Sequence, residues 1–226
     1  MSPTQRQPKE TAREYALRRI KHSIIHLELA PGSMVSENEL AARYGISRTP
    51  VREALIELGK AQIIEIFPQK GSRVSLIDYN LVEEASFMRR VLETAVAEEL
   101  CHLADELDFS HAHEILRLQK FDLQHPAPTR TFDLDNQFHA ELFRLCHKSR
   151  IHSLIDSVTT HFDRVRTMSL FVISYDRIVR DHYAIIEAIE RKNVEEARAA
   201  MTRHLSRYKF DKEVLKQKYP GCFKED

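Results

Sequence analysis

The stretch that decides the fold is PGSMVSENELAARYGISRTPVREALIEL, residues 31–58. Ser36 and Glu39 have the spacing of a capping box, in which each side chain accepts a hydrogen bond from the other's backbone N–H group at a helix start. Gly45 is expected to end that helix about two turns later, because glycine readily adopts left-handed backbone. Pro50 fits the first turn of a second helix. Two short helices joined by a Gly-containing turn predict a helix-turn-helix.

The second of these helices carries the candidate DNA-reading residues. In a helix-turn-helix it enters the major groove with its N-terminal residues at the base edges. Here those residues are Ser47, which can also cap the helix, Arg48, Thr49 and Arg52. The two arginines are four residues apart and project from the same side, where a guanidinium fork matches a guanine or a phosphate. The alternative is a small structural helical bundle whose arginines are merely solvated.

Elements on both sides of this stretch complete a winged helix. Apolar residues before it recur at helical spacing, which predicts an amphipathic helix over 10–28. Two β-like runs after it, 63–67 and 73–76, enclose a turn that contains Lys70 and Gly71. This pattern predicts a hairpin with a basic tip, able to lie along a phosphate backbone or in a minor groove.

Composition indicates a folded chain with two modules. The chain has 226 residues, of which 42% are hydrophobic and 30% charged, so it can bury a core. Net charge is zero but uneven: residues 1–76 hold 12 Lys and Arg against 8 Asp and Glu, and the remainder holds 22 against 26. A basic module joined to an acidic one suggests two tasks. We expect a DNA-binding domain over residues 8–77 and a second domain over residues 78–220.

Several protein classes are disfavoured. No run approaches the roughly 20 apolar residues of a membrane span, and the opening MSPTQRQPKE lacks an apolar signal-peptide core. The three cysteines are an odd, widely spaced set, which fits a reducing cytoplasm better than a disulfide framework. The glycine-rich nucleotide-binding motifs G-x-G-x-x-G and G-x-x-x-x-G-K do not occur in the sequence. We therefore expect a cytoplasmic protein without a membrane partner.

The second module is expected to be entirely helical. From Asp78 to about Tyr219, apolar residues fall at three- and four-residue spacing without strand-like alternation. Roughly six or seven helices fit this length, with breaks at Pro126, Pro128 and Ser174. The predicted fold class is mainly α, with an N-terminal winged helix-turn-helix and a C-terminal all-helical bundle.

One Asp and three His in this module form a candidate metal site. Asp135 and His139 are four residues apart on one helical face. His182 and His204 lie on two further helices with clear apolar faces. Converging inside a bundle, these ligands would favour zinc, nickel, cobalt, copper or iron over calcium. The alternative is a set of ordinary semi-buried histidines hydrogen-bonded to backbone groups.

The N-terminal motif resembles the GntR family of bacterial transcription regulators. The resemblance rests on residues 31–58, with SRTPVREAL as a specific signature, and on the following hairpin, which contains KG and ends in RV. It implies that Arg48 and Arg52 contact an operator, assisted by Ser47, Thr49, Lys70 and Gly71. Some members carry a DNA-contacting Arg where this chain has Asn38.

The helical module resembles the FCD-type ligand domain of the FadR subfamily. The similar runs are MRRVLETAVAEEL, DNQFHAELF, DHYAIIEAI and AAMTRHL. In that pattern one Asp and three His hold a metal, and they match Asp135, His139, His182 and His204. The resemblance further implies that Arg89, on the domain's first helix, faces the cavity and meets an effector carboxylate. Its neighbour Arg90 is the alternative for that role.

Together these features predict a DNA-binding transcription regulator whose operator binding is modulated by a small carboxylate metabolite at a divalent transition metal. Dimerisation is expected because two-fold symmetry doubles the specificity of one recognition helix on a palindromic site. A metal-dependent enzyme of small organic acids with an accessory DNA-binding module is the alternative, although no H-E-x-x-H motif or other catalytic residue stands out. In a third possibility the metal is purely structural or is itself the signal.

Overall fold

The computed structural model describes residues 5–125, 127–172 and 175–225. The chain divides into two compact units. One unit contains the described residues up to Tyr79 together with those from Lys216 onward, and the other is Asn80–Leu215. Pro126 and Ser174, where the sequence predicts helix breaks, lie outside the described residues.

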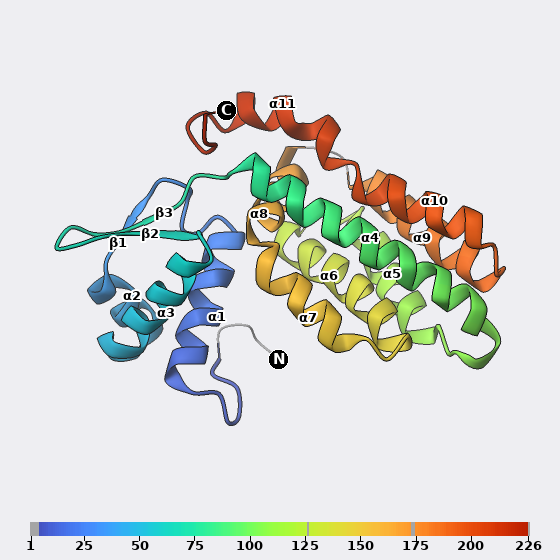
Figure 1. Ribbon diagram of the computed structural model, residues 1–226, viewed down its shortest axis with the longest axis horizontal. Coiled ribbons are helices and arrows are strands. Elements are labelled where there is room, and N and C mark those ends of the chain that lie inside the picture. The colour runs from blue at the N-terminus through green and yellow to red at the C-terminus, as the bar shows by residue number, and fades with distance from the viewer. Residues whose placement is uncertain (1–4, 126, 173–174, 226) are drawn as a thin grey trace. The chain divides into compact units, whose positions relative to one another are not determined.

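The first unit is a winged helix (Figure 1). Its described elements are α1 (Ala12–Ile25), β1 (Met34–Val35), α2 (Glu37–Tyr44), α3 (Arg48–Lys60), β2 (Ile64–Phe67) and β3 (Gly71–Val74). The strands form an antiparallel sheet in the order β1-β3-β2, and β2 and β3 extend as the wing. The sequence does not reveal β1, since two residues are too few to show an alternating pattern.

Local signals in the sequence set the limits of α2 and α3. Ser36 and Glu39 form the predicted capping box, and Gly45 ends α2 with a left-handed φ of 66°. Ser47 occupies the N-cap position of α3, but among the described residues its hydroxyl makes no capping hydrogen bond, so the predicted cap is wrong in that detail. Pro50 lies in the first turn of α3, as predicted.

The other boundaries differ slightly from the predicted ones. The first helix ends at Ile25 instead of near residue 28, because Leu27 has a left-handed φ of 61° that cannot continue a helix. β3 begins at Gly71, two residues before the predicted run, because Gly71 pairs with Phe67 across the hairpin. The inner side of α3 is apolar: Val51, Ala54, Leu55 and Leu58 are all buried.

The second unit is a helical bundle. Its described helices are α4 (Tyr79–Leu103), the short 3-10 turn η1 (Ala104–Glu106), α5 (Ser110–Asp122), α6 (Pro128–Leu145), α7 (Ser149–Val158), α8 (Thr160–Val172), α9 (Asp176–Glu190), α10 (Val194–Leu205) and α11 (Tyr208–Lys218). The fold class is as predicted, although these described residues hold eight α-helices. The sequence predicted only six or seven helices, because the break between α7 and α8 at Thr159 is not marked by a Pro or Gly.

Packing in the bundle brings α6, α9 and α10 around one interior. α9 packs on α10 and on α5, while α6 packs on α5, α7 and α8 (Figure 1). One apolar core joins α4, α5, α6, α9 and α10, and it includes Leu100, Phe138, Ile185 and Met201, all fully buried. The amphipathic faces read from the sequence therefore point inward, and they carry the candidate metal ligands with them.

The described C-terminal residues return to the end of the winged helix. Ile77 pairs in parallel with Phe223: its N–H donates to the Cys222 carbonyl at 2.9 Å, and its carbonyl accepts from the Lys224 N–H at 2.9 Å. The rings of Tyr79 and Phe223 stack with centroids 5.3 Å apart. The segment that leads out of β3 is thus held by a partner from the far end of the chain.

Candidate functional site

The candidate DNA-reading side chains lie at the start of α3 and on the wing. Ser47, Arg48, Thr49 and Arg52 are all exposed, and the side chains of the two arginines are each 59% accessible. Lys70 is exposed in the turn between β2 and β3. The structure therefore presents these predicted residues to solvent on elements of one unit.

Gly71 is required by the geometry of the wing. Its φ is 100°, a conformation that other L-residues rarely adopt. A Cβ atom there would lie 3.3 Å from the backbone carbonyl oxygen of Val35 on β1. Glycine at this position thus lets β1 and β3 approach closely. This structural role is separate from any contact that Gly71 makes with DNA.

Both arginines of α3 converge on one carboxylate. Arg52 donates through Nε to Glu37 Oε1 at 2.7 Å and through Nη2 to Glu37 Oε2 at 3.0 Å. Arg48 donates through Nη2 to Glu37 Oε2 at 3.2 Å. The sequence reading did not single out Glu37, although its place at the first position of α2 could have suggested a partner for the next helix.

The four predicted metal ligands come together inside the bundle. Asp135 and His139 lie on α6, His182 on α9 and His204 on α10, and one ligand atom from each lies within 4.8 Å of all the others. All four residues are buried. Helical spacing places the first two on one face, and packing of three helices adds the other two.

The second nitrogen of each imidazole faces an oxygen atom. His139 Nδ1 lies 2.6 Å from Glu93 Oε2, His182 Nδ1 lies 2.8 Å from Gln119 Oε1, and His204 Nδ1 lies 3.8 Å from Asp181 Oδ2. The Gln119 and Glu93 oxygens are close enough to hold the proton on Nδ1 of His182 and His139 and leave each Nε2 lone pair directed at the centre, as in histidines that bind metals. The distance of 3.8 Å at His204 is too long for a hydrogen bond. Asp181 directly precedes His182 in the sequence, so its place near the cluster could have been suspected. Glu93 and Gln119 were missed because they lie on helices α4 and α5, far from their partners in sequence.

The spacing of the donor atoms fits a single ion. The Nε2 atom of His204 lies 3.1 Å from that of His139 and 3.3 Å from that of His182. Asp135 Oδ1 lies 3.5 Å from His182 Nε2, and Oδ2 lies 3.7 Å from His139 Nε2. Two atoms bound to one ion at about 2.1 Å lie roughly 3.0–3.4 Å apart. A single proton on Nε2 of His204 cannot form good hydrogen bonds to Nε2 of both His139 and His182. A cation at the centre, by contrast, can be bound by the lone pairs of all three nitrogens and by the Asp135 carboxylate.

Burial keeps two of the imidazoles in the form that binds metals. Burial lowers the pKa of His139 to about 4, although the negative charge of Glu93 opposes the shift. The pKa of His182 falls well below its usual value, first because of burial and then because of His204. Burial alone would raise the pKa of Asp135, but Arg166 and the three histidines bring it well below its ordinary value. The neutral imidazoles of His139 and His182 and the carboxylate of Asp135 are suited to a borderline divalent metal.

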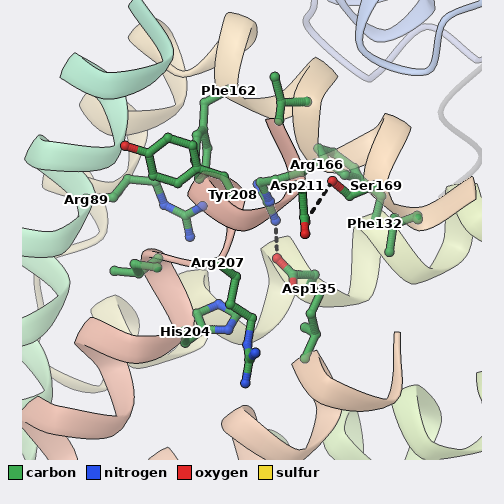
Figure 2. A pocket seen from close by; sticks show the side chains of 14 residues that line it. Arg89, Phe132, Asp135, Phe162, Arg166, Ser169, His204, Arg207, Tyr208 and Asp211 are labelled. Carbon is green, nitrogen blue, oxygen red and sulfur yellow. Dashed lines mark hydrogen bonds and ion pairs between the residues drawn. The ribbon is translucent and has the colours of Figure 1, made fainter. Parts of the chain in front are cut away.

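A cavity opens beside this cluster. It measures about 60 Å³ and is lined by Asp135 and His204 together with Arg89, Phe132, Phe162, Val165, Arg166, Ser169, Leu170, Ile178, Leu205, Arg207, Tyr208 and Asp211. Figure 2 shows the guanidinium groups of Arg89 and Arg166 directed into the same space, with Arg166 joined to Asp135. Arg90 is not among the lining residues, and its guanidinium lies over the ring of Phe87 at 5.9 Å.

Three arginines of the cavity are each paired with a carboxylate that belongs to the cluster or lies beside it. Arg89 Nε donates to Glu93 Oε1 at 2.6 Å, and Arg207 Nη2 donates to Asp181 Oδ1 at 2.8 Å. Arg166 donates to Asp135 itself and also, through Nη1, to Asp163 at 2.8 Å. The cavity therefore has positive groups on its wall, each connected through a carboxylate to a candidate metal ligand. Arg166 and Arg207 are functional candidates that helical spacing alone could not identify.

Comparison with known proteins agrees with both units. Residues 13–74 match the model of bacterial regulatory proteins of the gntR family, and residues 84–207 match the FCD domain. The HTH-type transcriptional repressor RspR of Escherichia coli K12 is 30% identical over 224 residues, covering 99% of this chain and 98% of that protein. An HTH-type transcriptional regulator in an unstable DNA locus of Streptomyces ambofaciens is 35% identical over 213 residues, covering 92% and 88%.

A solved structure shows the same fold. E. coli McbR/YncC superposes with a TM-score of 0.77 at 17% sequence identity, covering 92% of this chain and 99% of that one. Among the described residues, no helix is long and apolar enough to cross a membrane. The chain belongs to the GntR family of bacterial regulatory proteins and carries an FCD domain, and it is a DNA-binding transcription regulator.

Proposed function

We propose that operator binding by the winged helix is modulated by a small carboxylate metabolite, bound beside a divalent transition metal in the helical unit. The main support for this proposal is the buried cluster of Asp135, His139, His182 and His204, which has an arginine-lined cavity beside it. Ser47, Arg48, Thr49 and Arg52 of α3, with Lys70 and Gly71 of the wing, form the proposed DNA contacts.

In this proposal, one set of residues binds the metal and another binds the effector. The one carboxylate and three imidazoles hold the ion, which supplies positive charge and open coordination positions. Arg89 already uses Nε to hold Glu93, so its Nη groups remain for an effector carboxylate (Figure 2). The apolar rings of Phe132 and Phe162 limit water around the ligand. A volume of about 60 Å³ is enough for roughly four ordered waters or for the carboxylate end of a small acid.

Metal content and melting temperature test the metal site. Purified protein should contain about one first-row divalent ion per chain, and chelation should lower the melting temperature because the ion binds the folded state. The double variant H139A/H204A should contain no metal, and a chelator should leave its melting temperature unchanged. H111A/H113A, which alters two histidines at the N-terminus of α5 outside the cluster, is the matched control. Metal-free wild-type protein whose melting temperature resists both chelator and added zinc or nickel would overturn the proposal.

We further propose that the protein is a homodimer joined through the helical unit. Phe87 and Val91 lie one turn apart on α4 and are 61% and 51% exposed, an apolar pair that a second copy could cover. F87E should shift the sedimentation coefficient from that of a dimer to that of a monomer. L154E, at a residue of α7 that is 68% exposed, should not. Identical behaviour of the two variants would place the dimer contact elsewhere.

A further inference from the structure

Glu37 holds the two arginines of α3 through hydrogen bonds within the protein. It accepts two hydrogen bonds from Arg52 and one from Arg48, although these three residues lie on a solvent-facing surface. A single exposed ion pair contributes little, but a bidentate pair reinforced by a second arginine has a defined geometry. Arg52 therefore has a preferred orientation before any DNA arrives.

The way in which Glu37 binds Arg52 leaves the useful edge of the guanidinium open. The carboxylate bonds Nε and Nη2, which form the side edge of the group. The end edge, formed by the outward N–H groups of Nη1 and Nη2, is the pair that matches O6 and N7 of a guanine. A guanidinium held along its side edge thus offers its end edge in a fixed direction.

The carboxylate is itself firmly anchored. Glu37 is the first residue of α2, where the helix dipole favours a negative charge. The capping box of Ser36 and Glu39 fixes the backbone at that point. Hydrogen bonds from Arg52, and then from Arg48, lower the pKa of Glu37, so it stays charged at neutral pH.

We propose that Glu37 is a specificity-determining positioning residue of operator recognition, which aligns the end edge of Arg52 with a guanine. This inference rests on the proposed role of Arg52 in reading DNA. Pre-alignment spares the entropy of ordering a long side chain at the moment of binding. The negative charge of Glu37 also repels DNA phosphates. Where Arg52 has no guanine to bind, nothing offsets this repulsion, so Glu37 weakens binding to unrelated sequences.

The test compares discrimination between two duplexes. The first is the tightest duplex that the wild-type protein selects from a random-sequence library, and the second is the same duplex scrambled. A correct bidentate pair discriminates by about 1–3 kcal/mol, and we expect E37Q to reduce the affinity ratio of the two duplexes by about tenfold, within that range. The E37Q variant should bind the scrambled duplex more tightly than wild type. E53Q removes the same charge from an exposed position of α3 and should change both affinities alike, leaving the ratio unchanged.

Two further variants separate position from charge. E37D keeps the charge but shortens the side chain, so it should also lower the ratio while leaving binding to the scrambled duplex near the wild-type value. Replacing each guanine of the selected duplex in turn by 7-deazaguanine, which lacks the N7 acceptor, should reveal a site where wild-type protein loses affinity and R52A does not. At that site the replacement should lower the affinity of the E37Q variant less than it lowers the affinity of the wild-type protein.

The outcomes distinguish this inference from the function on which it rests. If R52A lowers the ratio but E37Q changes it no more than E53Q does, Glu37 has no positioning role. If R52A leaves the ratio at the wild-type value, Arg52 does not read the duplex, and both the proposed contact and the role of Glu37 are wrong. Circular dichroism and thermal melting of each variant establish that the winged helix is folded in every comparison.

Discussion

At the residue scale, the second nitrogen of each candidate metal-binding histidine matters as much as the first. Gln119 on α5 is fully buried, and its carbonyl oxygen accepts a hydrogen bond from His182 Nδ1. That bond fixes the ring and places the lone pair of Nε2 toward the other ligands. A residue that touches no metal can therefore control how well the metal is held.

Replacing Gln119 by leucine should weaken metal binding by about 10- to 100-fold, the usual effect of losing such a partner. Leucine has a similar volume but cannot accept the proton of His182 Nδ1. The measurement is the dissociation constant for zinc or nickel in competition with a chelator. Q137L makes the same change at an exposed position of α6, between two of the ligands, and should leave the constant unchanged. Equal affinities in Q119L and Q137L would contradict the orienting role.

The pH dependence of stability should report the buried imidazoles of metal-free protein. The folded-state pKa of His139 is about 4 and that of His182 is also depressed, whereas an unfolded histidine has a pKa of about 6.5. Between those values the unfolded chain binds more protons, so stability is full above about pH 6.5 and falls as the pH is lowered toward 4. The slope should approach about 1.4 kcal/mol per pH unit for each such histidine.

Chemical unfolding of metal-free protein at a series of pH values measures this slope. H139Q should have a shallower slope between pH 6.5 and 4, because one of the buried titrating groups is gone. H111Q, at a more exposed histidine on α5, should retain the wild-type slope. A wild-type protein whose stability does not change over this interval would contradict the expectation.

The candidate metal ligands could be identified from the sequence, but their surroundings could not. Asp135 and His139 follow from spacing on one helix, His182 and His204 from their places on two amphipathic helices, and the resemblance to FCD domains selects the same four residues. Arg166 lies 31 residues after Asp135, and no periodicity connects the two. Such partners are set by how α6 packs on α8, which a single sequence does not specify.

At the element scale, the winged helix shows where glycine is needed and where it is merely tolerated. Gly71 on β3 has a positive φ and lies against the backbone of β1, whereas Gly59 lies within α3 with ordinary helical backbone. A Cβ at Gly59 would meet the flexible end of Ile66 at 3.4 Å, an ordinary contact. The same substitution should therefore have opposite effects at the two positions.

G71A should destabilise the protein by about 1–3 kcal/mol, since alanine is strained at this φ and its Cβ would crowd Val35. G59A should be neutral or stabilise by up to about 1 kcal/mol, because alanine is the better helix former. Denaturant unfolding of the two variants and wild type measures both effects. A stabilising G71A would show that the wing adapts without strain.

The elements of the winged helix were predicted well because their signals are local. The capping box at Ser36 and the glycine stop at Gly45 are short-range features, and both are confirmed. The pairing of β1 with β3 is not local: it joins Met34 to Arg73, and a two-residue strand carries no pattern. Non-local pairing of this kind marks the limit of inference from the sequence.

At the scale of the whole molecule, two compact units share one chain, and the coupling proposed between them would be a free energy. If an effector carboxylate biases operator binding, operator DNA must change the affinity for that effector by the same factor. Arg89 lies on α4, which begins directly after the segment leaving β3. A movement of that helix is the proposed route between the two sites.

Operator DNA should change effector affinity by roughly 5- to 150-fold, the range of typical couplings. The measurement is calorimetry of a panel of small hydroxy acids and sugar acids on metal-loaded protein, with and without the selected duplex. R52A should abolish the difference while leaving effector affinity in the absence of DNA unchanged. A carboxylate that binds tightly and equally in both conditions would show a binding module or an enzyme, and the sensor proposal would be wrong.

The pairing of Ile77 with Phe223 has a consequence for synthesis of the protein. The ion pair between Lys224 and Asp78 joins residues 146 positions apart, so one partner leaves the ribosome long after the other. Residues 5–76 contain the whole winged helix and can fold while the bundle is still being made, since its elements depend on short-range signals. The segment that connects it to α4 gains its partner only when residues 222–224 emerge. A nascent chain thus carries a folded DNA-binding unit for some time before residues 222–224 can pair with the segment that follows it.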